Sequence, residues 1–181
     1  MGKCAHGIER FPELNRVAWL KTLPKWSVGA EIGVRAAKFS RRILRTVKPS
    51  LLWLVDCWST QPKVPYNLSD ECYLSDMRKA LRRVRGEILS GVVRVVCGFS
   101  REVVELVPDK SLDWLYVDAG HTYMECHEDL CLWFKCYLGL RLPIPAFTKR
   151  SKCIAHEYVL IIHRPIHSAT CGTTAFPSPL S

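Results

Sequence analysis

Residues 27–40 constrain the fold of this chain more than any other stretch. An apolar run there ends on the acid Glu31, Gly33 follows, and a basic amphipathic segment begins about one turn later. This order is typical of a buried parallel strand that leads into a helix through a tight turn. The turn leaves backbone N–H groups and a helix N-terminus facing the space above the sheet, so we expect a site there.

The rest of the chain repeats this alternation of strand and helix. Short apolar runs predict strands over 28–32, 51–55, 92–96 and 112–117. Amphipathic segments between and after them predict helices over 38–47, 70–89, 101–106 and 123–137. The order predicts an α/β fold, a Rossmann-like three-layer sandwich with a mainly parallel sheet. A fifth strand is expected over 158–162.

A chain of 181 residues is long enough for one domain with a single core. We expect an N-terminal segment over 1–26 with a short helix that packs on the domain. The domain itself is expected over 27–162. The tail over 163–181 is rich in Ser, Thr and Pro and is expected to be disordered.

Charge and cysteine content bear on partners and compartment. With 26 Lys and Arg against 17 Asp and Glu, the net charge is +9, which favours anionic partners such as nucleic acid. The basic cluster over 78–85 lies opposite an apolar seam, however, so a solvated helix face is the first interpretation and nucleic-acid binding the second. Nine cysteines without a Cys-x-x-Cys pair, no cleavable leader and no apolar run of roughly 20 residues predict a cytoplasmic protein without a membrane span.

Polar and flexible residues follow the ends of the predicted strands. Ligands of open parallel sheets bind beyond the carboxyl ends of the strands, where this chain places Glu31, Gly33, Asp56, Phe99, Ser100, Asp118 and His121. Asp56 follows Gly33 at a spacing close to the roughly 20 residues of dinucleotide sites, which predicts an acceptor for ribose hydroxyls. Each residue alone could equally be a helix cap or turn former, but the ordered set favours a nucleoside site.

Three motifs make the chain similar to a known family. Residues 30–40, 54–58 and 111–123 resemble the class I S-adenosylmethionine-dependent methyltransferases, and residues 129–135 resemble that family's following helix. The similarity is to the small-molecule branch, which has an acid-Ile-Gly-Val…Phe-Ser first motif and Asp-x-x-His-x-Tyr after the fourth strand. It covers about residues 27–137.

The resemblance implies a role for each site residue. Glu31 and Gly33 would line the methionine part of S-adenosylmethionine, and Asp56 would hold the ribose. Phe99 and Ser100 would border the adenine. Asp118 and His121 would face the transferable methyl group, as catalytic residues or, at Asp118, as a ligand of Mg²⁺.

The implied activity is methyl transfer to a small-molecule acceptor, at an oxygen. The chain also departs from the family: Ala37 stands where a second glycine is usual, and residues 136–143 lack the family's Pro-Gly-Gly turn. The family's last strands are therefore expected to be missing. The alternative is a non-catalytic relative that binds the cofactor or an anionic partner such as nucleic acid.

Overall fold

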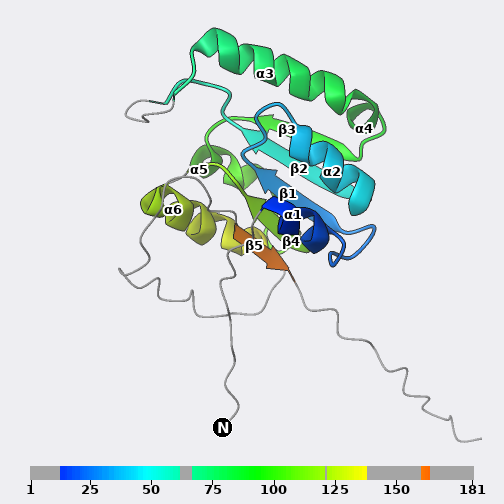
Figure 1. The fold of residues 1–181 in the computed structure, drawn as a ribbon. Coiled ribbons are helices and arrows are strands. Elements are labelled where there is room, and N and C mark those ends of the chain that lie inside the picture. The colour runs from blue at the N-terminus through cyan, green and yellow to red at the C-terminus, as the bar shows by residue number, and fades with distance from the viewer. Residues whose placement is uncertain (1–12, 62–66, 121, 138–159, 164–181) are drawn as a thin grey trace, which may run out of the picture.

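A single five-stranded sheet organises the chain in the computed structural model, which describes residues 13–61, 67–120, 122–137 and 160–163. The strand order is β3-β2-β1-β4-β5 (Figure 1). Four strands run parallel: β1 (Val28–Ile32), β2 (Leu51–Asp56), β3 (Val93–Cys97) and β4 (Trp114–Val117). The fifth, β5 (Leu160–His163), pairs with β4 in the antiparallel direction.

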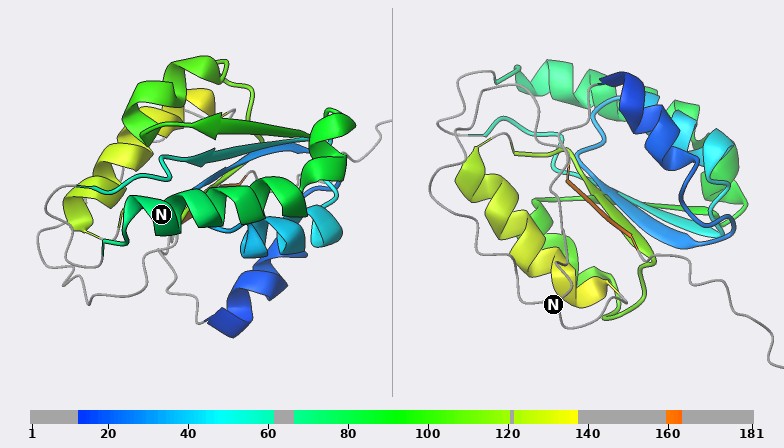
Figure 2. Two further views of the ribbon diagram at one scale, coloured as in Figure 1. Left: turned by 90° about the horizontal axis from the view of Figure 1, so that it is seen from above. Right: turned by 60° about the horizontal axis from the view of Figure 1, so that its bottom comes forward.

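Helices cover both faces of this sheet, which confirms the predicted Rossmann-like three-layer fold (Figure 2). One face packs against α1 (Glu13–Leu20), α2 (Lys38–Thr46), α3 (Asp70–Arg83) and α4 (Arg85–Leu89). The other packs against α5 (Ser100–Val103), the 3-10 turn η1 (Val104–Leu106), α6 (Tyr123–Trp133) and a second 3-10 turn, η2 (Phe134–Cys136).

The alternation of side chains along each strand builds the two cores. Leu52, Leu54, Trp114 and Tyr116 point to the face with α1 and α2, whereas Trp53, Val55, Leu115 and Val117 point to the face with α6. Both sets are buried, as a parallel sheet covered on both faces requires. Trp53 and Trp114 are therefore core residues.

Three predicted helices are divided in the structure. Helix 101–106 consists of α5 and η1, and helix 123–137 ends as α6 at Trp133 and continues as η2. Helix 70–89 is interrupted more sharply. The structure divides it into α3 and α4 at Val84, whose φ of −113° and ψ of 17° are not helical. Val84 is fully buried in the core that includes the sheet, and Gly86 follows it in α4. Glycine has the lowest helix propensity of all residues except proline. The five basic residues over 78–85 remain on the outside, as predicted.

The other boundaries shift by a residue or two. β4 begins at Trp114 rather than at residue 112, and Leu112 instead forms an isolated parallel bridge with Tyr137. β5 overlaps the predicted strand over 158–162. The expectations for residues 1–12, 138–159 and 164–181, including the disordered tail, lie outside the described residues. Within the described ranges, the helices are too short or too polar to cross a bilayer.

Candidate functional site

The carboxyl ends of β1, β2 and β4 meet at one edge of the sheet. The Gly33 N–H donates to the Val55 carbonyl at 2.8 Å, and the Asp118 N–H donates to the Ile32 carbonyl at 2.8 Å. Gly33 has a φ of +90°, and a Cβ atom there would lie 2.2 Å from the Asp118 carbonyl oxygen. Any larger residue at position 33 would collide with the backbone after β4, so a glycine is required there.

Asp56 ties the turn after β1 to the end of β2. Its Oδ2 accepts hydrogen bonds from the N–H groups of Val34 at 2.8 Å and Arg35 at 2.7 Å, and its Oδ1 accepts one from Trp58 N–H at 2.8 Å. An ionised carboxylate has about four acceptor positions. Asp56 therefore keeps room for about one further donor, such as one ribose hydroxyl.

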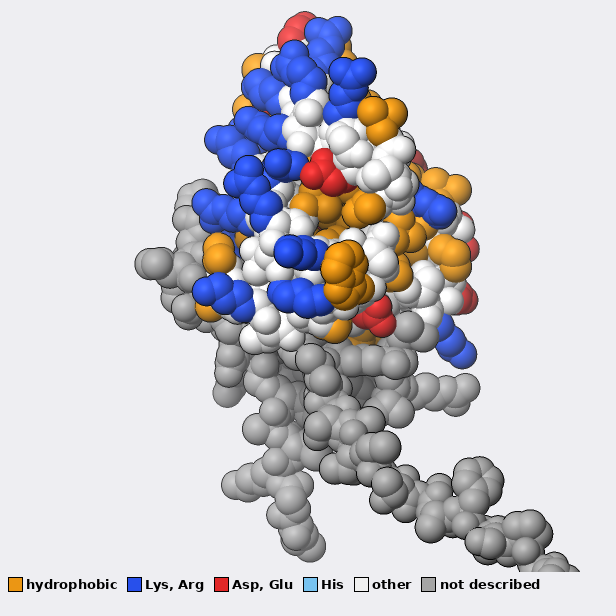
Figure 3. Space-filling model, turned by 90° about the vertical axis from the view of Figure 1, so that its right-hand side faces the viewer, with side chains coloured by type: hydrophobic (Ala, Val, Ile, Leu, Met, Phe, Trp, Pro, Cys, Tyr) orange, Lys and Arg blue, Asp and Glu red, His pale blue; other side chains and the backbone are white. Residues whose placement is uncertain are grey.

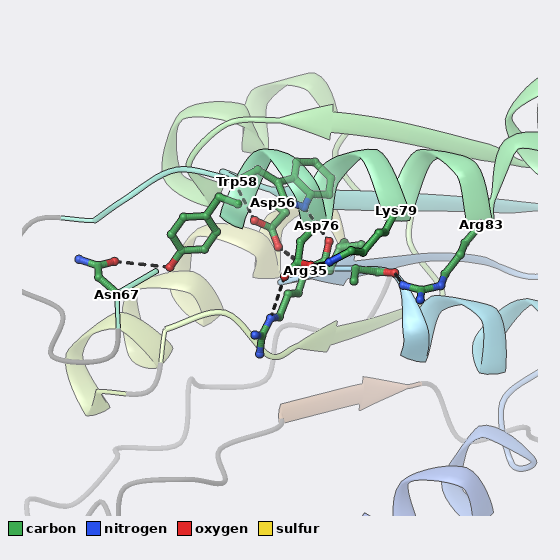
Figure 4. A network of polar contacts seen from close by, with 10 residues as sticks. Arg35, Asp56, Trp58, Asn67, Asp76, Lys79 and Arg83 are labelled. Atoms are coloured by element: carbon green, nitrogen blue, oxygen red, sulfur yellow. Dashed lines mark hydrogen bonds and ion pairs between the residues drawn. The ribbon is translucent and has the colours of Figure 1, made fainter. Parts of the chain in front are cut away.

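The turn after β1 is also held from the side of α3 (Figure 4). The Trp58 indole N–H donates to the Arg35 carbonyl at 2.7 Å, and Arg35 Nε lies 3.2 Å from Asp76 Oδ2, which Figure 4 shows beside Lys79. Arg35 and Ala37 both adopt the left-handed conformation, with φ of 50° and 56°. Ala37 thus takes the backbone conformation that a glycine would favour, although it carries a methyl group.

Glu31 lies at the centre of this edge, between Leu54 and Tyr116 in the register of the strands. The residue is only 1% exposed, and its Oε2 atom has no hydrogen-bond partner among the described residues. Burial raises the pKa of Glu31 to about 8, and the nearby charges of Asp118 and Asp56 act in the same direction. The side chain is therefore mostly protonated at neutral pH.

Asp118 is paired with a cation from the N-terminal helix. Its Oδ2 lies 3.4 Å from Arg16 Nη1 and accepts a hydrogen bond from the Tyr116 hydroxyl at 3.2 Å. The Tyr116 ring stacks on Trp19 and Phe39, with centroids 6.2 and 4.6 Å away. Burial raises the pKa of Tyr116, so the phenol stays protonated and remains a donor. Helix α1 thus covers the end of β4.

Phe99 and Ser100 follow β3 at the same edge, and two strands, β2 and β1, lie between β3 and the β4 strand that Asp118 follows. The Gly98 N–H donates to the Asp56 carbonyl at 3.0 Å, which brings this segment next to the end of β2. The Ser100 hydroxyl donates to Asp129 Oδ1 on α6. Burial raises the pKa of Asp129 to about 6, against the opposing effect of the Ser100 hydrogen bond.

The predicted site residues therefore gather at one sheet edge, apart from His121, which lies outside the described residues. In the described ranges, no three His, Cys, Asp or Glu side chains are placed to hold a metal ion together. The Arg16 guanidinium, 3.4 Å from Asp118 Oδ2, repels a cation. The described donors do not fit a Mg²⁺ site.

Sequence reasoning did not identify three residues of this edge. Arg16 carried no signal, because its contact with Asp118 spans 102 residues of sequence. Tyr116 and Asp129 lie in segments that resemble the family, but their spacing does not reveal their hydrogen bonds. Tyr116 donates to Asp118, and Asp129 accepts from Ser100. A buried acid on α6 is detectable only once the helix is packed on the sheet.

Fold and site together define a Rossmann-like α/β protein with an acidic site at the carboxyl edge of its sheet. A family model described as "Methyltransferase domain" matches residues 30–137. The match covers more than half of the chain, and the chain belongs to this family of methyltransferase domains. No curated protein matches the chain.

Several solved structures are similar in fold. M. jannaschii TYW2 in complex with AdoMet is 12% identical over 74% of this chain and 51% of its own, with a TM-score of 0.46. M. capricolum TrmK in complex with S-adenosylhomocysteine is 18% identical over 68% and 47%, with a TM-score of 0.42. Spermidine synthase from Thermotoga maritima is 12% identical over 65% and 37%, with a TM-score of 0.44. The chain spans about half of these proteins or less, and similarity at this level carries no information about substrate.

Proposed function

We propose that this domain binds S-adenosylmethionine at the carboxyl edge of the sheet and transfers its methyl group to an oxygen of a small-molecule acceptor. The observation that supports this most is the cluster of Glu31, Asp56 and Asp118 around the ends of three adjacent strands. They lie at neighbouring strand ends, because β1 pairs with β2 on one side and with β4 on the other. The family match makes methyl transfer the natural chemistry for such a site.

The residues present fit this cofactor in charge. S-adenosylmethionine carries a sulfonium and an ammonium group, both positive. The Asp56 carboxylate is an anion at this edge, and Glu31 would become one by releasing its proton when a cation lies beside it. The unpartnered Glu31 Oε2 is a buried acceptor that an ammonium group would satisfy. Asp56 would accept one ribose hydroxyl, and Phe99 and Ser100 would border the adenine from the next strand end.

The proposed chemistry is a single displacement. The cofactor supplies a methyl group on a positively charged sulfur, and the acceptor oxygen forms a bond to that carbon as the carbon–sulfur bond breaks, with the electron pair staying on sulfur. Alignment of donor and acceptor provides much of the acceleration. Asp118 or His121 would take the proton from the acceptor hydroxyl. Asp118 would then have to exchange its contact with Arg16 for one with the acceptor.

Calorimetric titration with S-adenosylmethionine tests the cofactor assignment. The parent protein should bind one equivalent, and Asp56→Asn should bind about ten-fold more weakly or worse, since it loses a charged acceptor. Asp113→Asn is the matched control: Asp113 Oδ2 also accepts a backbone N–H at 2.8 Å, from Val28, but at the opposite end of β1. It should bind as the parent does.

Two results would contradict this assignment. A parent protein that folds but does not bind S-adenosylmethionine would refute the cofactor. Equal affinity of Asp56→Asn and the parent would refute the ribose contact alone.

The second candidate is a non-catalytic member of the family that binds the cofactor without turnover. The pairing of Asp118 with Arg16 favours it, because the predicted base is already neutralised. Formation of S-adenosylhomocysteine with a panel of hydroxylated small molecules separates the two candidates. If the parent transfers the methyl group and Asp118→Asn binds the cofactor but no longer transfers it, the domain is an enzyme. If the parent binds the cofactor but transfers no methyl group, the second candidate is supported.

A further inference from the structure

The helices on one face of the sheet form a strongly basic surface. Residues 35–48 contain six basic side chains and no acid: Arg35, Lys38, Arg41, Arg42, Arg45 and Lys48. The inner stripe of α2, formed by Ile43, Leu44 and Val47, is buried, so the basic side chains lie on the outer part of the helix. Figure 3 shows Lys and Arg side chains gathered along one side of the molecule.

Part of this charge is compensated and part is not. Arg41 pairs with Glu87 at 2.7 Å, and Arg35 and Lys79 pair with Asp76. Arg42, Arg45 and Lys48 are exposed and form no ion pair within the described part of the chain. Uncompensated cations on one surface attract a polyanion.

A pocket of about 290 Å³ opens beside Arg45 and Lys48. It is lined by residues that precede β1, β2 and β3, by one side of α2 and by α4, among them Trp26, Arg41, Arg45, Lys48 and the acid Glu87, whose charge Arg41 compensates. It therefore lies at the amino ends of the strands, opposite the acidic edge.

Trp26 gives the pocket an aromatic wall. Its side chain is 73% exposed, which is unusual for a residue this large. Its backbone is fixed, because Trp26 N–H donates to the Lys48 carbonyl at 3.1 Å and φ is +60°. An exposed indole on a fixed backbone, beside exposed cations, is the arrangement with which proteins stack bases and hold the adjoining phosphates.

We propose that this face is a second binding site, for single-stranded nucleic acid, with a base stacked on Trp26 and phosphates held by Arg42, Arg45 and Lys48. An acidic membrane fits less well. A helix that lies in a membrane surface offers an apolar face to the lipid, whereas the apolar face of α2 is buried in the core. Arginine also suits phosphate oxygens by its planar, forked donors.

The test is binding of a fluorescein-labelled single-stranded oligouridylate of 15 nucleotides, measured by anisotropy over a series of salt concentrations. Lys48→Gln should weaken binding and lower the salt slope by about 0.7, the value for one phosphate contact on a single strand. Lys110→Gln is the matched control, because Lys110 is also an exposed lysine and its φ of 54° is near the 52° of Lys48. Lys110 precedes β4, which lies on the other side of β1 from the β2 strand that Lys48 precedes. It should leave affinity and slope unchanged.

Trp26→Ala tests the stacking part separately. It should weaken binding about ten-fold or more at every salt concentration without changing the slope, and Trp26→Phe should restore most of the affinity. An oligonucleotide that does not bind, equal losses for Lys48→Gln and Lys110→Gln, or an unchanged affinity of Trp26→Ala would each overturn the proposal. So would binding to phosphatidylserine vesicles in place of the oligonucleotide. None of these variants touches the acidic edge, so calorimetry with S-adenosylmethionine reports on that site independently.

Discussion

Glu31 shows how a single buried acid links stability to ligand binding. A carboxyl group with a pKa of about 8 instead of the usual 4.5 holds a proton in the folded protein that it loses in the unfolded chain. Between these two pH values the folded state binds more protons than the unfolded state, so the free energy of unfolding falls as pH rises. The residue is thus tolerated in the core as a neutral acid.

Replacing this acid should remove the pH dependence that it causes. Glu31→Gln should gain stability relative to the parent as pH rises from about 4.5 to 8, by up to about 1.4 kcal/mol for each pH unit, with no further gain above pH 8. Urea unfolding at a series of pH values measures the difference. Asp129→Asn is the control, because the pKa of Asp129 is raised only to about 6 and its effect should end there. A constant difference between Glu31→Gln and the parent across the whole range would contradict the assignment.

The same residue predicts proton release on cofactor binding. A cation beside Glu31 lowers the pKa of its carboxyl group, so affinity for S-adenosylmethionine should rise with pH up to about 8 and then level off. Calorimetry in buffers of different ionisation enthalpy should show a proton released at pH 7 by the parent and none by Glu31→Gln. Equal release by both proteins would place the titrating group elsewhere.

At the scale of single elements, the helix that follows β4 depends on its N-terminal cap. Thr122 Oγ1 accepts a hydrogen bond from Glu125 N–H at 3.2 Å, and Glu125 Oε2 accepts one from Thr122 N–H at 3.1 Å, which completes a capping box. Thr122→Ala should cost about 1 kcal/mol of unfolding free energy. Ser69→Ala at the start of α3 should cost less, because its bond to Cys72 N–H is longer, at 3.4 Å, and no box supports it. Equal losses in urea unfolding would contradict this ranking.

The elements themselves were largely predictable from the sequence. Continuous apolar runs identified the four parallel strands to within two residues, because such strands are buried on both faces and leave a strong signal. The break at Val84 was missed, since a buried valine fits the apolar stripe of an uninterrupted helix equally well. The site was predictable as a set of strand ends, while its internal bonds were not: Asp56 accepts three backbone N–H groups that no spacing reveals.

At the scale of the whole molecule, the sheet depends on one tight contact between neighbouring strands. A Cβ atom on Gly29 of β1 would lie 2.1 Å from the indole ring of Trp114 on β4. Trp114 is fully buried, and its indole N–H donates to the Ser27 hydroxyl at 2.8 Å, so the ring cannot move aside. Gly29→Ala should therefore lose about 3 kcal/mol or more of unfolding free energy.

A paired substitution provides the control for this prediction. Gly29→Ala combined with Trp114→Phe should be less unstable than the sum of the two single variants, because the smaller ring vacates the space that the new methyl group needs. Thermal unfolding followed by circular dichroism gives the three values. Strictly additive losses would show that the clash with Trp114 is not the cause.

The pairing of Arg16 with Asp118 has a consequence for how the chain assembles during synthesis. Arg16 leaves the ribosome long before its partner 102 residues later, whereas β1, β2 and β3 can pair among themselves in between. The nascent chain therefore passes through a stage in which one edge of β1 is open and helix α1 can pack on α2 but lacks its contacts with β4. Such an edge invites pairing with other chains. Only the emergence of β4 ends this exposed interval, and the acidic edge is completed in that same step.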